Sequence, residues 1–301
     1  MSGYAFGWRW LGLLAGTGGG AIVLTSVLTA PVAFGDADDP LSGSDTAIIL
    51  GGTLEPTPST AFAQAAENLY LHPLGFDDGA TSSTVCDMIG TDPCAAPLQV
   101  LTTPELIQQS TLTDADDVTL AVENEFNADP GAFTAADPLT IFGYSQSAAA
   151  ESIAMTQIND YSMAHGDSIP LDDLHFVFIG DPSLPGGIGA NTNVTPDDLY
   201  PATIYTLDGD GVADYQQDVT AGGQLDALYN LFTTHAEYLG LTSTQIADAT
   251  TSIDGDLTNI DISDNINSFD ALIGALDNGI GSSGLFESLF ESLELYLTNM
   301  F

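Results

Sequence analysis

One serine in the sequence has the neighbours of a nucleophile. It lies at the centre of Gly143-Tyr144-Ser145-Gln146-Ser147, which approximates the motif G-x-S-x-G of a serine exposed on a strained turn between a strand and a helix. Small residues are needed there because the backbone approaches itself closely; Ser147 replaces the last glycine, and three alanines follow it. Ser145 is therefore a candidate nucleophile for acyl transfer. The alternative is an ordinary serine in a strand-to-helix turn.

A serine nucleophile needs a general base, and the sequence has four histidines, namely His72, His165, His175 and His235. In enzymes with this turn the chain order is serine, acid, histidine. His72 precedes the serine, His165 lies in a polar stretch, and His175 begins an apolar run typical of a buried strand. His235 follows every candidate acid, and we expect it to be the base.

The acid that orients the histidine is expected in the segment Thr203–Tyr215, which offers Asp208, Asp210 and Asp214. Asp210 closely follows the apolar part of this segment and lies between two glycines, which allow a tight turn. It is the predicted acid, and Asp214 is the alternative. The Asp-x-Asp-Gly sequence also resembles a calcium-binding loop. A valine stands at a ligand position and no glutamate closes the loop, so calcium is the minor interpretation and no metal site is predicted.

The oxyanion that forms during acyl transfer needs two backbone N–H donors. One is expected from Gln146, the residue after the serine. The other is expected from Thr53, in the Gly51-Gly52-Thr53 loop that follows an early apolar run. A serine, a histidine, a carboxylate and two amides complete such a site, so no cofactor is expected.

Four continuous apolar runs alternate with helical patterns along the chain. Such runs are typical of strands that are buried on both faces of a parallel sheet. The sequence therefore predicts an α/β fold with a mostly parallel sheet and helices on both faces, and a site at the carboxyl ends of the strands. The predicted strands are Ala47–Leu50, Leu139–Phe142, Phe176–Ile179 and Thr203–Thr206.

The charge balance restricts the partners. The chain has 42 acidic residues, one basic residue (Arg9) and no lysine, so its formal net charge is −41. Such a surface repels the phosphate backbone of DNA and RNA, which excludes nucleic-acid binding. Anionic substrates and anionic lipid headgroups are disfavoured as well, which leaves neutral or cationic ligands. Salt is expected to stabilise the fold by screening the repulsion.

The N-terminus has the composition of an export signal. Arg9 precedes an uncharged, largely apolar run from Trp10 to Gly35, with small residues near its end. An uncleaved membrane anchor is the alternative, because the run is long enough to span a bilayer, although glycines and Pro31 interrupt it. Either interpretation puts the body of the protein outside the cytoplasm. Cys86 and Cys94 are then expected to form a disulfide.

The sequence divides into four parts. Residues 1–35 are the predicted signal or anchor, 36–45 a polar linker, 46–250 the α/β domain, and 251–301 an acidic C-terminal extension. The extension is predicted to end in an amphipathic helix that packs on the domain; a membrane or partner helix is the alternative. The apolar stripe of this helix comprises Leu285, Phe286, Leu289, Phe290 and Leu293.

Together the motifs resemble the PE-PPE C-terminal domain family of mycobacteria and related actinobacteria. The matching segments run in order from about Ala47 to Ala249 and are "GGTLEPTPS", "FGYSQS", "FVFIGDPSLPGG", "YPATIYTLDGDGVADY" and "HAEYLGLTSTQ". The Gly-x-Ser-x-Ser form of the serine motif is the usual one in that family. The resemblance implies an α/β-hydrolase fold akin to that of cutinases.

The resemblance also implies a serine esterase for short to medium acyl esters with Ser145, an aspartate and His235 as its triad; the acid carries over best onto Asp210, with Asp214 as the alternative. With the predicted signal, the esterase is expected to be secreted or held at the cell envelope. The expected partner is a small neutral ester or lipid; association with the envelope and the oligomeric state stay open. The chain departs from the family in its acidity, in its apparent signal in place of an N-terminal PE or PPE module, and in its tail after Thr250. The alternative function is a non-catalytic exported envelope or binding protein on the same scaffold, since a fold does not fix a function.

Overall fold

The computed structural model describes residues 39–280, apart from residue 54 and the segments 80–82, 106–109, 166–168, 191–193 and 264–267. The predicted signal or anchor and the predicted C-terminal amphipathic helix therefore lie outside the described residues. Among the residues that are described, no helix combines the length and the apolar character needed to cross a bilayer.

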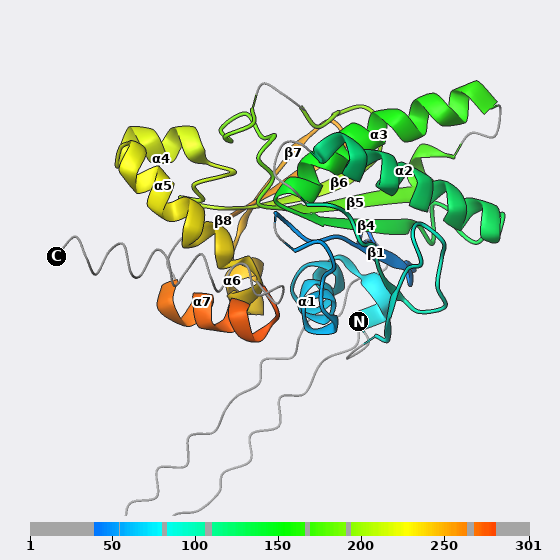
Figure 1. Ribbon diagram of the computed structural model, residues 1–301, viewed down its shortest axis with the longest axis horizontal. Helices are drawn as coiled ribbons and strands as arrows, with labels where there is room; N and C mark the ends of the chain where they lie inside the picture. Colours follow the sequence, from blue (N-terminus) through cyan, green and yellow to red (C-terminus); the bar gives the residue numbers. More distant parts are fainter. Residues whose placement is uncertain are drawn as a thin grey trace, which may run out of the picture. The chain divides into compact units, whose positions relative to one another are not determined.

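The described chain forms an eight-stranded sheet in the order β2-β3-β1-β4-β5-β6-β8-β7 (Figure 1). All neighbouring strands pair in parallel except β7 and β8, which are antiparallel. The predicted α/β-hydrolase fold, with its mostly parallel sheet, is confirmed. The strands are β1 (Ala47–Ile49), β2 (Val85–Asp87), β3 (Leu98–Val100), β4 (Leu139–Tyr144), β5 (Leu174–Ile179), β6 (Ala202–Leu207), β7 (Thr250–Asp254) and β8 (Leu257–Ile262).

Helices cover both faces of this sheet (Figure 1). The α-helices are α1 (Thr60–Ala66), α2 (Thr111–Ala128), α3 (Gln146–His165), α4 (Tyr215–Ala221), α5 (Gln224–Phe232), α6 (Ser243–Ala247) and α7 (Ser268–Asp277). The short 3₁₀ or π segments are η1 (Glu67–Leu71), η2 (His72–Leu74), η3 (Phe76–Gly79), η5 (Leu171–Asp173), η6 (Thr234–Ala236) and η7 (Tyr238–Gly240).

The central strands are buried on both faces because successive side chains point into two separate cores. One core joins the sheet to α2 and α3, the other to α1, α6 and α7. Figure 1 shows α2 and α3 on one side of the sheet and α1, α6 and α7 on the other. The core with α2 and α3 receives Ile48 from β1, Ile141 from β4, Phe176 from β5 and Ile204 from β6. The core with α1, α6 and α7 receives the next residue of each strand, namely Ile49, Phe142, Val177 and Tyr205.

Residues on both sides of the predicted domain, 46–250, pack or pair with it in the structure. Leu41, in the predicted linker, is fully buried, and its N–H donates to the carbonyl of Leu74 at 2.7 Å, while the Ser44 hydroxyl donates to the Pro138 carbonyl. At the other end the sheet continues past residue 250, because β8 pairs with β6 and β7 closes the edge. All five residues of β7 are exposed, and this polar composition made the strand look like part of an extension.

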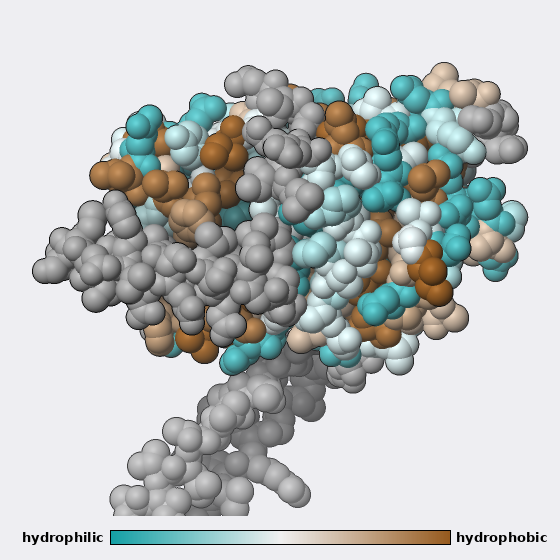
Figure 2. Space-filling model, viewed as in Figure 1, coloured by the Kyte–Doolittle hydropathy of each residue, from teal (hydrophilic) through white to brown (hydrophobic). Residues whose placement is uncertain are grey.

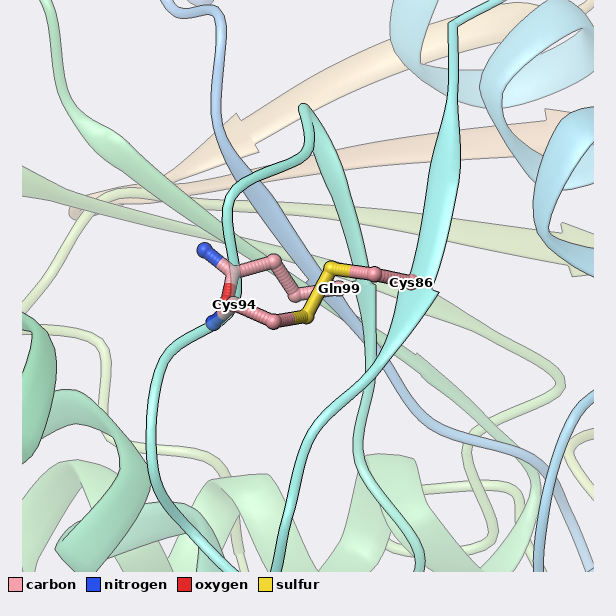
Figure 3. Close-up of a disulfide and its surroundings, with 3 residues drawn as sticks. All are labelled: Cys86, Cys94 and Gln99. Atoms are coloured by element: carbon pink, nitrogen blue, oxygen red, sulfur yellow. A yellow bond between two sulfur atoms is a disulfide. The ribbon is translucent and has the colours of Figure 1, made fainter.

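The predicted disulfide between Cys86 and Cys94 is confirmed (Figure 3). It ties β2, the strand at one end of the sheet, to the loop that leads into β3. The Gln99 side chain lies beside it, and its carbonyl accepts the backbone N–H of Cys94 at 2.7 Å. The covalent link and this hydrogen bond both hold a short strand that would otherwise depend on one neighbour.

Candidate active site

Ser145 lies on the strained turn that the sequence predicts. It follows β4, precedes α3 and has a φ of 57°, in the left-handed region that a residue with a side chain seldom adopts. Its N–H donates to the carbonyl of Ile179 at 2.9 Å, so the neighbouring strand holds the turn. The Ser147 hydroxyl accepts the N–H of Tyr144 at 2.8 Å, which explains how a serine replaces the last glycine of the motif.

Ser145, His235 and Asp210 form one chain of hydrogen bonds. The Oγ of Ser145 lies 2.7 Å from Nε2 of His235, and Nδ1 of the same ring lies 2.9 Å from both carboxylate oxygens of Asp210. An ionised carboxylate can only accept, so Nδ1 carries the proton and Nε2 is left to accept from the serine. That is the tautomer a general base requires.

The carboxylate of Asp210 is fully buried and held from three sides. Besides His235 it accepts the backbone N–H of Val212 at 2.7 Å and the hydroxyl of Tyr238 at 2.8 Å. Burial, and then the charge of Asp210, raise the pKa of the Tyr238 hydroxyl well above its usual value. Tyr238 therefore keeps its proton and remains a donor. The sequence did not single out Tyr238, although it lies three residues after His235.

Asp214, the alternative acid, makes no hydrogen bond to His235 that the structure gives. It is the residue that precedes α4. Burial raises the pKa of its carboxyl to about 6. A hydrogen bond from the backbone of Gly209 acts in the opposite direction but does not cancel the effect of burial. The structure thus brings Asp210, and not Asp214, to the histidine.

The ring of His235 is fixed by its packing. Tyr144 stacks on it with ring centroids 5.1 Å apart, and the Tyr144 hydroxyl donates to the His235 carbonyl at 2.6 Å. Gly180, at the end of β5, has a φ of 61°, and a Cβ there would lie 2.8 Å from the Cε1 atom of His235. A glycine is needed at this position for both reasons.

The two predicted oxyanion residues are also brought together, although they lie far apart in sequence. The hydroxyl of Thr53 donates to the side-chain carbonyl of Gln146 at 3.0 Å. Gly52 packs so closely on the serine turn that a Cβ there would lie 2.8 Å from the Tyr144 ring and 3.1 Å from Cβ of Ser145. The loop after β1 therefore meets the start of α3 beside Ser145.

The other three histidines lie outside this arrangement. His175 is buried in β5, its Nε2 is 3.0 Å from the hydroxyl of Thr203, and burial lowers its pKa to about 4. His72 lies 3.3 Å from Glu67, and His165 is the last residue of α3. In the part of the chain that the structure describes, no group of three or more histidine, cysteine or acidic residues is arranged to hold a metal ion.

The chain is similar to proteins of *Mycobacterium tuberculosis* (strain ATCC 25618 / H37Rv). It is 28% identical over 214 residues to "Uncharacterized PPE family protein PPE28", covering 66% of this chain and 30% of that protein. It is 28% identical over 227 residues to "Esterase PE16", covering 68% of this chain and 39% of that protein. The chain thus spans less than half the length of each of these relatives.

Among solved structures, a cutinase-like protein from *Cryptococcus* sp. superposes with a TM-score of 0.35 and 15% sequence identity, over 67% of this chain and 97% of that one. The model of the PE-PPE domain matches residues 95–260, more than half of the chain. This match contains β4 with the serine turn, β5, β6 and the segment of His235. The chain belongs to the PE-PPE domain family.

Proposed function

We propose that this protein is a serine ester hydrolase with Ser145 as nucleophile, His235 as general base and Asp210 as the acid that orients it. The observation that carries the proposal is the buried chain of hydrogen bonds through these three side chains, at 2.7 and 2.9 Å. The printed name of one relative, "Esterase PE16", supports the same reaction class.

The chemistry follows from the hydrogen bonds. Nε2 of His235 takes the proton of Ser145 as Oγ attacks the ester carbonyl carbon. The carbonyl oxygen becomes an oxyanion, which the backbone N–H groups of Gln146 and Thr53 stabilise. The imidazolium then gives its proton to the departing alcohol, and an acyl-serine remains. Water, deprotonated by the same nitrogen, releases the acid and restores the serine.

Asp210 stabilises the imidazolium formed in each step. Because Val212 and Tyr238 also donate to this carboxylate, its position does not depend on the state of the histidine. No cofactor takes part in these steps.

We propose neutral apolar esters of short to medium acyl length as substrates. The net charge of −41 opposes the approach of anions. The helix α5 exposes Leu225, Leu228 and Tyr229, and Figure 2 shows apolar surface at the left of the molecule, where Figure 1 labels α4 and α5. Since the end of α5 leads directly into the segment of His235, we propose that this apolar surface receives the acyl chain.

We propose that the site works outside the cytoplasm, with residues 1–35 as the export signal. The disulfide between Cys86 and Cys94 supports this location because such bonds persist in oxidising compartments. Detection of the folded chain in the culture medium or the envelope fraction, and not in the cytosol, tests it.

A fluorophosphonate probe tests the reaction class. Ser145 Oγ is expected to attack the phosphorus of the probe and displace fluoride, while His235 takes the serine proton, so the parent chain should be labelled and Ser145→Ala should abolish labelling. Ser147→Ala is the matched control, because Ser147 is a neighbouring buried serine whose hydroxyl binds backbone. A folded parent chain that the probe does not label would favour the non-catalytic binding protein instead.

The charge predicts a preference among esters. At low salt, kcat/KM for a neutral ester should exceed that for its carboxylated analogue by about tenfold or more, because the field of the protein repels the anion. Molar salt should reduce the difference by screening. Equal rates that do not respond to salt would contradict the proposed substrate class.

A further inference from the structure

The side chain of Gln146 makes a buried bridge beside the candidate site. Its carbonyl Oε1 accepts from the hydroxyl of Thr53 at 3.0 Å. Its Nε2 donates to the carboxylate of Asp114 at 2.8 Å and to the hydroxyl of Ser110 at 2.7 Å. Ser110 in turn donates to the same carboxylate oxygen at 3.0 Å. Both amide hydrogens and the carbonyl of Gln146 are thereby used.

Asp114 decides which way the amide of Gln146 faces. It lies in the first turn of α2 and is fully buried. If the amide were reversed, its carbonyl would face the carboxylate of Asp114 and two acceptors would oppose each other. With the amide held as it is, its carbonyl meets Thr53, so the Thr53 hydroxyl must donate to Gln146. The hydroxyl proton of Thr53 is therefore used in the hydrogen bond to Gln146, and the backbone N–H of Thr53 is the group that can donate to an oxyanion.

The bridge joins the two loops that must act together. The N–H groups proposed to hold the oxyanion come from residues 93 positions apart, one after β1 and one at the start of α3. A shift of a fraction of an ångström between them would move one donor away from the oxyanion, and such donors act only when they are placed in advance.

We propose that Asp114, with Ser110, is a positioning residue that holds Gln146 against Thr53 and so sets the spacing of the oxyanion donors. This inference rests on the proposed ester hydrolysis and deepens it. Asp114 touches neither Ser145 nor His235 through any hydrogen bond that the structure gives, and its hydrogen bond from Gln146 is the link to the site on which the inference rests.

The first test compares Asp114→Ala with Asp116→Ala in the full chain. Asp116 lies on the same helix, is exposed, and accepts from Gln157 at 2.9 Å. Asp114→Ala should lower kcat for a neutral activated ester by about tenfold or more and leave KM nearly unchanged, because the oxyanion exists only after attack. Asp116→Ala should match the parent, and Asp114→Asn, which retains an acceptor, should lose less than Asp114→Ala.

A trifluoromethyl ketone measures oxyanion stabilisation directly. Ser145 Oγ adds to its carbonyl carbon, the serine proton passes to His235, and the former carbonyl oxygen becomes the oxyanion. Asp114→Ala should weaken this inhibitor by about the factor lost in kcat, while the binding of the corresponding alcohol, which forms no oxyanion, should not change. Equal weakening of both inhibitors would overturn the proposal.

Thr53→Val tests the other end of the bridge and keeps the inference falsifiable if Asp114→Ala fails to fold. It removes the hydroxyl, keeps the backbone N–H, and should lower kcat as Asp114→Asn or Asp114→Ala does. The double variant should be no worse than the more affected single, because the residues act as one unit. If the losses in kcat of the two single variants add in the double variant, the bridge is rejected. It is also rejected if the parent is active and the Asp114 variant has the same kcat as Asp116→Ala. Neither outcome contradicts the proposed esterase activity. An inactive, unlabelled parent would reject the esterase itself.

Discussion

Replacing Ser145 or His235 by alanine is expected to lower kcat for ester hydrolysis by about 10⁴- to 10⁶-fold. In the proposed mechanism Oγ of Ser145 supplies the bond to the acyl group, and Nε2 of His235, 2.7 Å away, takes its proton. Neither function survives alone, so the double variant should be hardly worse than either single variant. The measurement is kcat for a neutral activated ester, with circular dichroism to confirm folding.

The acid is tested by a matched pair of substitutions. Asp210→Asn should lower kcat by about 10⁴-fold, because an amide at this position can favour the wrong tautomer of His235. Asp214→Asn should have a much smaller effect, since Asp214 lies at the start of α4 and makes no hydrogen bond to His235 that the structure gives. Loss of activity in Asp214→Asn with full activity in Asp210→Asn would transfer the role, and full activity in His235→Ala would reject the triad.

The strands that carry the site could be predicted because burial on both faces leaves a simple signal. β1, β4, β5 and β6 consist mostly of apolar residues, and the predicted strands overlap each of them. β2 and β3, with three residues each, lie in a stretch that looks irregular, since so short a strand is defined by its partner. β7 was missed for another reason: all five of its residues are exposed, so it lacks an apolar pattern, although it pairs with β8 across a short turn.

Chain order favours His235 among four histidines, because it follows every candidate acid, but it cannot choose between Asp210 and Asp214. That choice depends on one tight turn, in which the N–H of Asp210 donates to the carbonyl of Leu207 at 3.0 Å and its carboxylate turns inward. The position of Asp114 beside the site could not be predicted from the sequence either. Three aspartates crowd the first half of α2, and only the rotation of the packed helix buries Asp114 and leaves Asp116 exposed.

Buried carboxyls should also make this protein less stable as the pH rises above 7. Glu105 is fully buried, and burial, with the nearby charge of Asp114, raises its pKa to about 9. Glu151 is fully buried in α3, neither of its carboxylate oxygens has a hydrogen-bond partner among the described residues, and burial raises its pKa well above the usual value. Both groups prefer to stay protonated in the folded chain.

The direction of the effect follows from proton linkage. A carboxyl with a raised pKa keeps its proton in the folded state after the unfolded chain has released it, so the free energy of unfolding falls until the pH passes the folded-state pKa. His175, whose pKa is lowered to about 4, acts in the opposite direction, but only below its ordinary pKa of about 6.5. Asp181 and Asp214, with pKa values of about 6, have largely completed their effect by pH 7. The fall expected between pH 7 and 9 therefore comes chiefly from Glu105, and Glu151 acts in the same direction.

Between pH 7 and 9 the free energy of unfolding is expected to fall by roughly 2 kcal/mol from Glu105 alone, since each pH unit below its folded-state pKa of about 9 contributes about 1.4 kcal/mol and the contribution fades as that pKa is reached. Urea unfolding at fixed molar salt measures this fall while screening stays constant. Glu105→Gln should flatten the dependence and be more stable than the parent at pH 9, because the amide can still accept from the Thr103 hydroxyl that now binds Glu105 at 2.8 Å. Asp116→Asn, on the exposed face of α2, should keep the parent slope. A parent chain whose stability is level or rises from pH 7 to 9 would show that both carboxyls are already ionised in the folded protein at pH 7.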